Sequence, residues 1–172
     1  IANEGPEAVL VTLQGEELRR ISSDLSRIKA IAIEGDNLLV GDGFGRLQRL
    51  TKDGTALGSP FSLEGGFADT EGIAVTATGQ LVTVEDDPER LSWFEPDGRL
   101  MARVDTMTLT PPLSEAQGIA IDPRTGHLLI VDVWEGSNSL YEFSSDGQLL
   151  GQVSLLAFGN DPEGIAIRPG FD

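Results

Sequence analysis

One short apolar motif occurs four times along the chain and constrains its fold more than any other feature. The motif is Gly-Ile-Ala-Ile or a close variant, and its copies begin at Ala30, Gly72, Gly118 and Gly164. The steps between them are 42, 46 and 46 residues. Each copy has the apolar, partly β-branched composition of a buried strand. A repeat of this length, built from short strands and Gly-containing turns, is typical of a β-propeller, in which each repeat forms one four-stranded blade.

Further strands are predicted after each motif copy. A second apolar strand ends at Asp42, Glu85 and Asp132, and a third strand leads into an Asp-Gly turn. The N-terminal residues repeat the spacing of the third strand at Leu18 to Asp24, which predicts strands two and three of another blade. We therefore expect one all-β domain of about four blades, with a partial blade at 1–27, blades at 28–68, 69–114 and 115–160, and a closing inner strand at 161–172.

The two ends of the chain carry complementary parts of a blade. Pairing them would close a four-bladed ring and bury strand edges that otherwise promote aggregation. Asp24 and Ala30 are only six residues apart, however, which leaves no room for an outer strand in the first hairpin. The chain also begins at Ile1 rather than Met, as expected of a processed or partial protein. A closed four-bladed ring and a piece of a larger ring both remain open.

The charge of the chain excludes several classes of partner. Its 172 residues include 28 acidic and 12 basic side chains, which give a net charge of −16. A field of this sign repels nucleic acids and anionic membrane surfaces, so neither is an expected partner. The absence of Cys excludes disulfides and thiolate sites. No apolar run approaches the roughly 20 residues of a membrane helix, so we expect no membrane span.

Many of the acidic residues are expected on one face of the propeller. Neighbouring strands are antiparallel, so the loops between strands two and three lie on the same face as the links between blades. Clustered carboxylates on that face suit a hard cation such as Ca²⁺, which takes roughly six to eight oxygen ligands. A solvated acidic surface that favours solubility is the alternative. The candidate metal ligands are Asp69, Glu71, Glu85, Asp86, Asp132, Asp161 and Glu163, and the further candidate ligand-binding residues are Asp42, Gln117 and Trp134.

Acid–base catalysis on this face has three candidates, Glu71, Glu85 and Glu163. Paired carboxylates in a pocket can acquire the shifted pKa values that proton transfer requires. The alternative is that these side chains hydrogen-bond loop amides. His127 is the only histidine and is expected in a turn on the opposite face, which excludes a Ser-His-Asp triad.

The second full repeat resembles known propeller families. Its segments Asp69-Thr70-Glu71-Gly72-Ile73-Ala74, Leu81 to Glu85 and Arg90 to Gly98 resemble the repeat of the esterase-like phytase and SdiA-regulated propellers, and are similar to NHL repeats. The resemblance covers essentially the whole chain. It implies a functional role for the acid before Gly-Ile-Ala and for the acid that ends strand two, which are Glu71, Glu85 and Glu163 in this chain. Gln117 and Lys29 depart from this acidic pattern.

The resemblance also implies export from a bacterial cell, to a periplasmic or extracellular location. Two functions follow as expectations. The first is a propeller that binds Ca²⁺ and a small ester or phosphoester on its acidic face, with metal-dependent hydrolysis as an open question. Hydrolysis would need a bridging cation, because bare carboxylates repel phosphate. The second is a non-catalytic scaffold of the NHL kind that binds a protein or a glycan.

Overall fold

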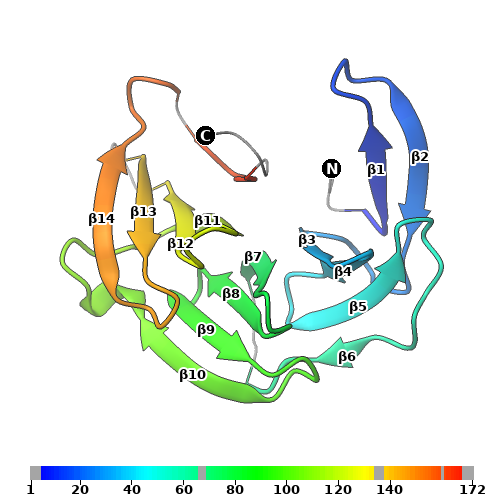
Figure 1. The fold of residues 1–172 in the computed structure, drawn as a ribbon, viewed down its shortest axis with the longest axis horizontal. Coiled ribbons are helices and arrows are strands. Elements are labelled where there is room, and N and C mark those ends of the chain that lie inside the picture. The colour runs from blue at the N-terminus through cyan, green and yellow to red at the C-terminus, as the bar shows by residue number, and fades with distance from the viewer. Residues whose placement is uncertain (1–4, 66–68, 134–137, 160, 168–172) are drawn as a thin grey trace.

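The fold is an arc of β-sheets arranged like the blades of a propeller (Figure 1). The computed structural model describes residues 5–65, 69–133, 138–159 and 161–167. All of the sheets are antiparallel, and within each sheet neighbouring strands follow one another in the sequence. The prediction of an all-β, propeller-like fold is therefore confirmed.

Three blades have four strands each, which run in chain order from the centre of the arc outward. Blade B contains β3 (Ala30–Glu34), β4 (Asn37–Gly41), β5 (Arg46–Thr51) and β6 (Phe61–Ser62). Blade C contains β7 (Thr70–Val75), β8 (Leu81–Glu85), β9 (Arg90–Phe94) and β10 (Leu100–Asp105). Blade D contains β11 (Ala116–Ile121), β12 (Leu128–Asp132), β13 (Ser139–Phe143) and β14 (Leu149–Ser154), and a short 3₁₀ helix, η1 (Thr106–Thr108), precedes it. The first three motif copies form the innermost strands β3, β7 and β11, as the repeat predicts.

Blade A is a two-stranded sheet of β1 (Glu7–Val11) and β2 (Glu17–Ser22). These strands correspond to the third and fourth strands of a blade, and the prediction of strands two and three was wrong. β2 is followed directly by β3, the innermost strand of the next blade, as the fourth strand β6 is followed by β7. Ile21 of β2 packs against Gly54 of the next blade, just as Phe61 of β6 packs against Gly98.

The error has a physical reason. Leu18 and Asp24 reproduce the spacing of a third strand and its turn, but Asp24 lies in the link to β3. There its carboxylate accepts a hydrogen bond from the side-chain amide of Gln48 at 2.6 Å. The short link before Ala30 is therefore an ordinary connection from a fourth strand to the next inner strand.

Apolar side chains between neighbouring blades form the core, because each sheet packs one face, or in blades B and C both faces, against the next blade. The contact between blades A and B is built around Ile21, Ile28, Val40 and Leu50. Blades B and C enclose Leu39, Leu47, Ile73 and Phe94. Blades C and D enclose Val84, Trp93, Ile130, Tyr141 and Phe143. The core is thus a series of interfaces between blades that fixes where the loops of each blade lie.

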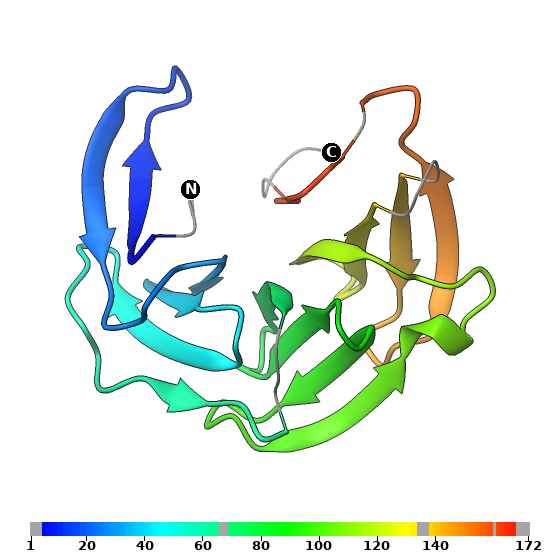
Figure 2. The same cartoon turned by 180° about the vertical axis from the view of Figure 1, so that it is seen from behind.

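Residues 161–167 occupy the position of an inner strand beside β11 (Figures 1 and 2). Gly118 lies against the backbone of Glu163, Gly164 and Ile165, as Gly72 lies against Ile119. Residues 161–167 are assigned to no strand, and residues 168–172 of the predicted closing strand lie outside the described residues. Among the described residues no strand pairing joins this segment to β1, so the structure shows an arc without closure between its ends.

Helical structure is limited to η1 in the part of the chain that the structure describes. Within these residues, no helix has the length and apolar character needed to cross a membrane.

Candidate functional site

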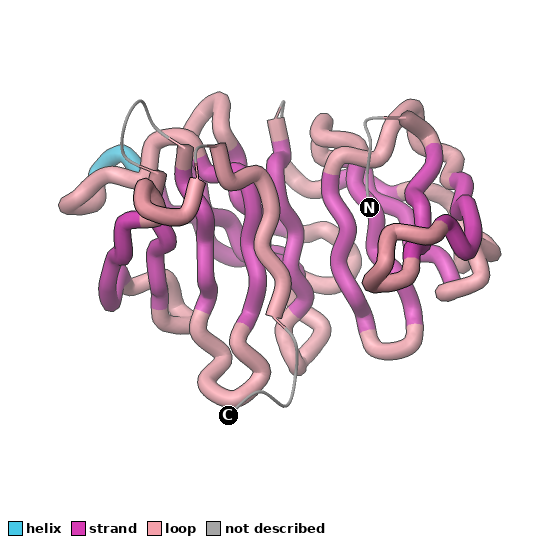
Figure 3. Tube along the Cα trace, turned by 90° about the horizontal axis from the view of Figure 1, so that it is seen from above, coloured by secondary structure: helices cyan, strands magenta, loops and turns pink. Residues whose placement is uncertain are grey.

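The strands run between two faces of the arc, and the loops gather on each face (Figure 3). Backbone hydrogen bonds join the loops that follow the second strands to the links that precede the first strands. The Asp86 amide donates to the Asp69 carbonyl at 3.0 Å, and the Val133 amide donates to the Glu115 carbonyl at 3.0 Å. These two kinds of loop therefore share one face, which we call the acidic face.

Three carboxylates of the acidic face come together beside blade C. Asp69 and Glu71 stand at the start of β7, and Asp86 follows the end of β8. One carboxylate oxygen from each lies within 4.8 Å of the other two. Asp69 has a φ of 75°, a left-handed conformation that is uncommon for residues other than glycine. We call these three residues the acidic triad.

Lys29 reaches the acidic triad from the neighbouring blade. Its Nζ lies 2.5 Å from Asp69 Oδ1 and also donates a hydrogen bond to Glu71 Oε1. Lys29 stands directly before β3, at the repeat position that Glu71 occupies before Gly72. The ammonium group therefore ties blade B to blade C and offsets part of the negative charge of the triad.

The pKa values of these groups reflect burial and the contact with Lys29. Burial raises the pKa of Glu71 to about 7, and the hydrogen bond from Lys29 only partly opposes this effect. The same ammonium group lowers the pKa of Asp69 through its hydrogen bond. Burial alone would lower the pKa of Lys29, but its two carboxylate partners raise it above its ordinary value. Burial, followed by the charge of Glu115, raises the pKa of Asp86.

The acidic triad could hold a metal ion. Carboxylate oxygens are the ligands that hard divalent cations prefer, and a cation would relieve the repulsion among the three carboxylates. The Lys29 ammonium competes for two of the same carboxylates. The sequence grouped the triad on one face but did not reveal this contact, and its one signal was a lysine at a repeat position that is Glu in two other copies and Gln in the third.

Glu85 lies apart from the acidic triad in a buried polar cluster. Its side chain is 1% exposed, and Oε1 accepts a hydrogen bond from Thr83 at 3.2 Å and lies 3.8 Å from the Arg103 guanidinium. Burial raises its pKa. Arg103 also donates to the Gly65 carbonyl in the link that leaves blade B. This arrangement joins two blades in the interior of the protein.

Asp42 and Asp132 hold loops through backbone amides. Asp42 Oδ1 accepts hydrogen bonds from the amides of Phe44 and Arg46. Asp132 Oδ1 accepts hydrogen bonds from the amides of Ser114 and Glu115 in the link before β11. Both residues are buried. At the end of its second strand, each carboxylate holds a nearby loop in place through these hydrogen bonds.

The other predicted site residues are not part of the triad. Asp161 and Glu163 are exposed, and Gln117 is half-buried in β11. Trp134 lies outside the described residues. The roles assigned to these four side chains stay predictions.

Comparisons with known proteins support the fold. No protein-family model and no curated protein sequence matches the chain. A crystal structure of a protein of unknown function from Bacteroides caccae matches with a TM-score of 0.56 and 14% identity, over 89% of this chain and 56% of that one. A chain in a crystal structure of the mitotic checkpoint complex matches with a TM-score of 0.59 and 11% identity, over 88% of this chain and 45% of that one. The chain thus spans about half the length of these two proteins, and at such identities the likeness shows the fold alone.

Proposed function

We propose that this protein is a propeller-like binding module that holds Ca²⁺ at the acidic triad. The observation that carries the proposal is the approach of three carboxylate oxygens to within 4.8 Å of one another at one edge of the acidic face. Ca²⁺ suits these ligands because it accepts carboxylates in mono- or bidentate mode and tolerates irregular geometry. Waters or an added ligand would complete its coordination.

Lys29 competes with Ca²⁺ for the carboxylates of the acidic triad. Its ammonium group has to release Asp69 and Glu71 before both carboxylates can turn fully toward a metal ion. A proton held by Glu71 competes as well, because metal ligands must be deprotonated. Ca²⁺ binding is therefore expected to strengthen as the pH rises through about 7.

A bound Ca²⁺ would give this acidic face an affinity for anions. The triad alone repels a phosphate or carboxylate group, whereas a cation with free coordination positions can bridge to an oxygen of the ligand. The proposed ligand is accordingly a small ester or phosphoester that binds through the metal.

Thermal unfolding with increasing Ca²⁺, with calorimetric titration alongside, tests the metal site. A ligand bound only by the native state raises apparent stability by mass action, so millimolar Ca²⁺ should raise the Tm of the wild-type protein. Glu71→Gln and Asp86→Asn should abolish most of this rise. Glu163→Gln is the matched control, because Glu163 holds the same repeat position but is exposed. An unchanged wild-type Tm, or an equal loss in the control, would contradict the proposal.

Hydrolysis is a second candidate function, favoured by one observation. The pKa of Glu71, raised to about 7, suits a group that donates and accepts protons near neutral pH. Turnover of p-nitrophenyl phosphate or p-nitrophenyl acetate that is lost in Glu71→Gln would support this function, and it is measured both with EDTA and with Ca²⁺ because a bound metal ion displaces the Glu71 proton. Absence of turnover under both conditions would leave a binding module without catalytic activity.

A further inference from the structure

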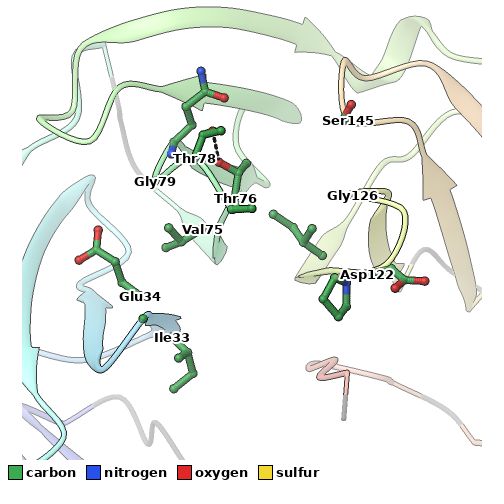
Figure 4. Close-up of a pocket in the computed structure, with 14 residues that line it drawn as sticks. Ile33, Glu34, Val75, Thr76, Thr78, Gly79, Asp122, Gly126 and Ser145 are labelled. Carbon is green, nitrogen blue, oxygen red and sulfur yellow. Dashed lines mark hydrogen bonds between the residues drawn. The ribbon is translucent and has the colours of Figure 1, made fainter. Parts of the chain in front are cut away.

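A hollow lies at the ends of the inner strands opposite to the acidic triad (Figure 4). Its volume is about 740 Å³, and its walls come from the ends of β3, β7 and β11 with the turns that follow them. Glu34, at the end of β3, and Asp122, directly after β11, lie on it, whereas the acidic triad stands at the other ends of these strands. We call it the turn-side hollow.

Three aliphatic side chains line the turn-side hollow at equivalent positions. Ile33, Val75 and Ile121 are the last residues of the first three motif copies. Ile33 is 61% exposed, although it belongs to one of the innermost strands. The repeat that builds the core therefore also places apolar surface in this hollow, where it can be covered by a ligand.

Uncharged polar groups surround these side chains. Thr76 and Thr78 lie in the turn after β7, with their hydroxyl oxygens 3.0 Å apart, and Ser145 reaches the hollow from the turn after β13. Gln80 also lines the hollow, but its side-chain amide lies 3.5 Å from Met101 Sδ of the outer strand β10. Hydroxyl groups at the edge of an apolar site can orient a ligand that carries a hydrogen-bonding group.

The hollow has no uncompensated carboxylate among its described lining residues. Glu34 accepts two hydrogen bonds from the Arg49 guanidinium, at 2.7 and 2.9 Å. Asp122 forms an ion pair with Arg124 at 3.3 Å. The hollow is thus locally balanced in charge on a chain with a net charge of −16, in contrast to the acidic triad with its single lysine.

We propose that the turn-side hollow binds an uncharged small molecule with a branched aliphatic body and a hydroxyl or carbonyl group. Its volume falls within the roughly 300–1,000 Å³ of sites for small ligands. The aliphatic side chains supply apolar contact, and the threonine and serine hydroxyls supply hydrogen bonds. An anion is repelled by the overall charge, and a cation is drawn to the acidic face. This site is separate from the proposed Ca²⁺ site and does not depend on it.

Fluorescence titration with the neutral dye Nile red, in the presence of EDTA, tests the proposal. The wild-type protein should bind the dye saturably. Ile33→Asp should weaken binding by about tenfold or more, because it places a charge in the apolar site. Ile33→Ala should weaken it by a smaller factor, through lost apolar contact alone. Leu13→Asp is the matched control, since Leu13 is 95% exposed in the β1–β2 turn and should change nothing.

The anionic dye ANS distinguishes a neutral site from general apolar exposure. It should bind about tenfold more weakly than Nile red at low salt, because the protein repels it. Circular dichroism of each variant establishes that the fold is retained. The proposal is overturned if Nile red fails to saturate, if both Ile33 variants bind as the wild type does, or if ANS binds as tightly as Nile red.

Discussion

At the scale of single residues, one substitution between repeats determines the electrostatics of the acidic face. Lys29 stands where Glu71 stands one repeat later, and its ammonium group contacts both Asp69 and Glu71. The pKa of Asp69 falls while that of Glu71 rises to about 7, because burial outweighs the contact with Lys29 at Glu71. Two carboxylates that share one lysine therefore differ in protonation near neutral pH.

The raised pKa of Glu71 predicts that stability falls as pH increases. Between its ordinary pKa of 4.5 and about 7, the native state keeps the Glu71 proton that the unfolded state has lost. The native state binds more protons in this window, so the free energy of unfolding decreases across it, by roughly 1 to 3 kcal/mol. Urea unfolding at several pH values between about 5 and 8 measures this slope. Glu71→Gln should flatten it and Glu163→Gln should not, and an equal slope in all three proteins would refute the assignment.

The sequence placed the acids on one face but could not determine which of them cluster. Asp69, Glu71 and Asp86 meet because the loop after β8 bonds to the link before β7. Asp132, at a matching repeat position, instead uses an oxygen to hold two backbone amides. Whether a carboxylate joins the cluster or binds backbone amides depends on the contacts that its side chain makes with neighbouring loops and blades. The spacing of the repeats does not encode these contacts.

At the scale of the elements, the repeat predicted the inner strands because their Gly-Ile-Ala motif varies least from blade to blade. The N-terminal hairpin was assigned wrongly because outer strands share the same alternation of apolar and polar residues. The packing of Ile21 against Gly54 and the position of β2 directly before the innermost strand β3 identify β1 and β2 as third and fourth strands. The alternation of apolar and polar residues predicts that a segment is a strand. Its contacts with the next blade show which position it takes in its own blade.

Gly72, the glycine of the repeated motif in β7, has a testable role in blade packing. A Cβ atom at Gly72 would lie 3.0 Å from the backbone nitrogen of Ile119 and 3.0 Å from Val84 Cγ2. Gly72→Ala should therefore push blades C and D apart and lower the free energy of unfolding by about 1–3 kcal/mol. Gly151→Ala in β14 is the control, because its Cβ would meet nothing within 4 Å, and it should be neutral or stabilise by up to about 1 kcal/mol. Equal destabilisation of the two variants in urea unfolding would show that close packing at Gly72 is not the cause.

At the scale of the whole molecule, the two faces of the arc differ in electrostatic character. The acidic face holds carboxylates with one shared lysine, whereas each carboxylate of the turn-side hollow has its own arginine. The same inner strands connect both faces, with Glu71 near one end of β7 and Val75 at the other. A chain with a net charge of −16 thus places its candidate cation site at the acidic triad and leaves the turn-side hollow locally balanced in charge.

The net charge predicts that salt stabilises the protein, and the prediction separates general screening from a specific cation site. Repulsion among the acids weakens as the Debye length shortens, so raising NaCl from about 10 to about 200 mM should increase the Tm by a few degrees. Ca²⁺ at the triad should act at far lower ionic strength, because mass action requires only a concentration above its Kd. Glu71→Gln should retain the response to NaCl and lose the response to Ca²⁺. If NaCl leaves the Tm of the wild-type protein unchanged, self-repulsion does not limit its stability, and any effect of Ca²⁺ then has to come from direct binding.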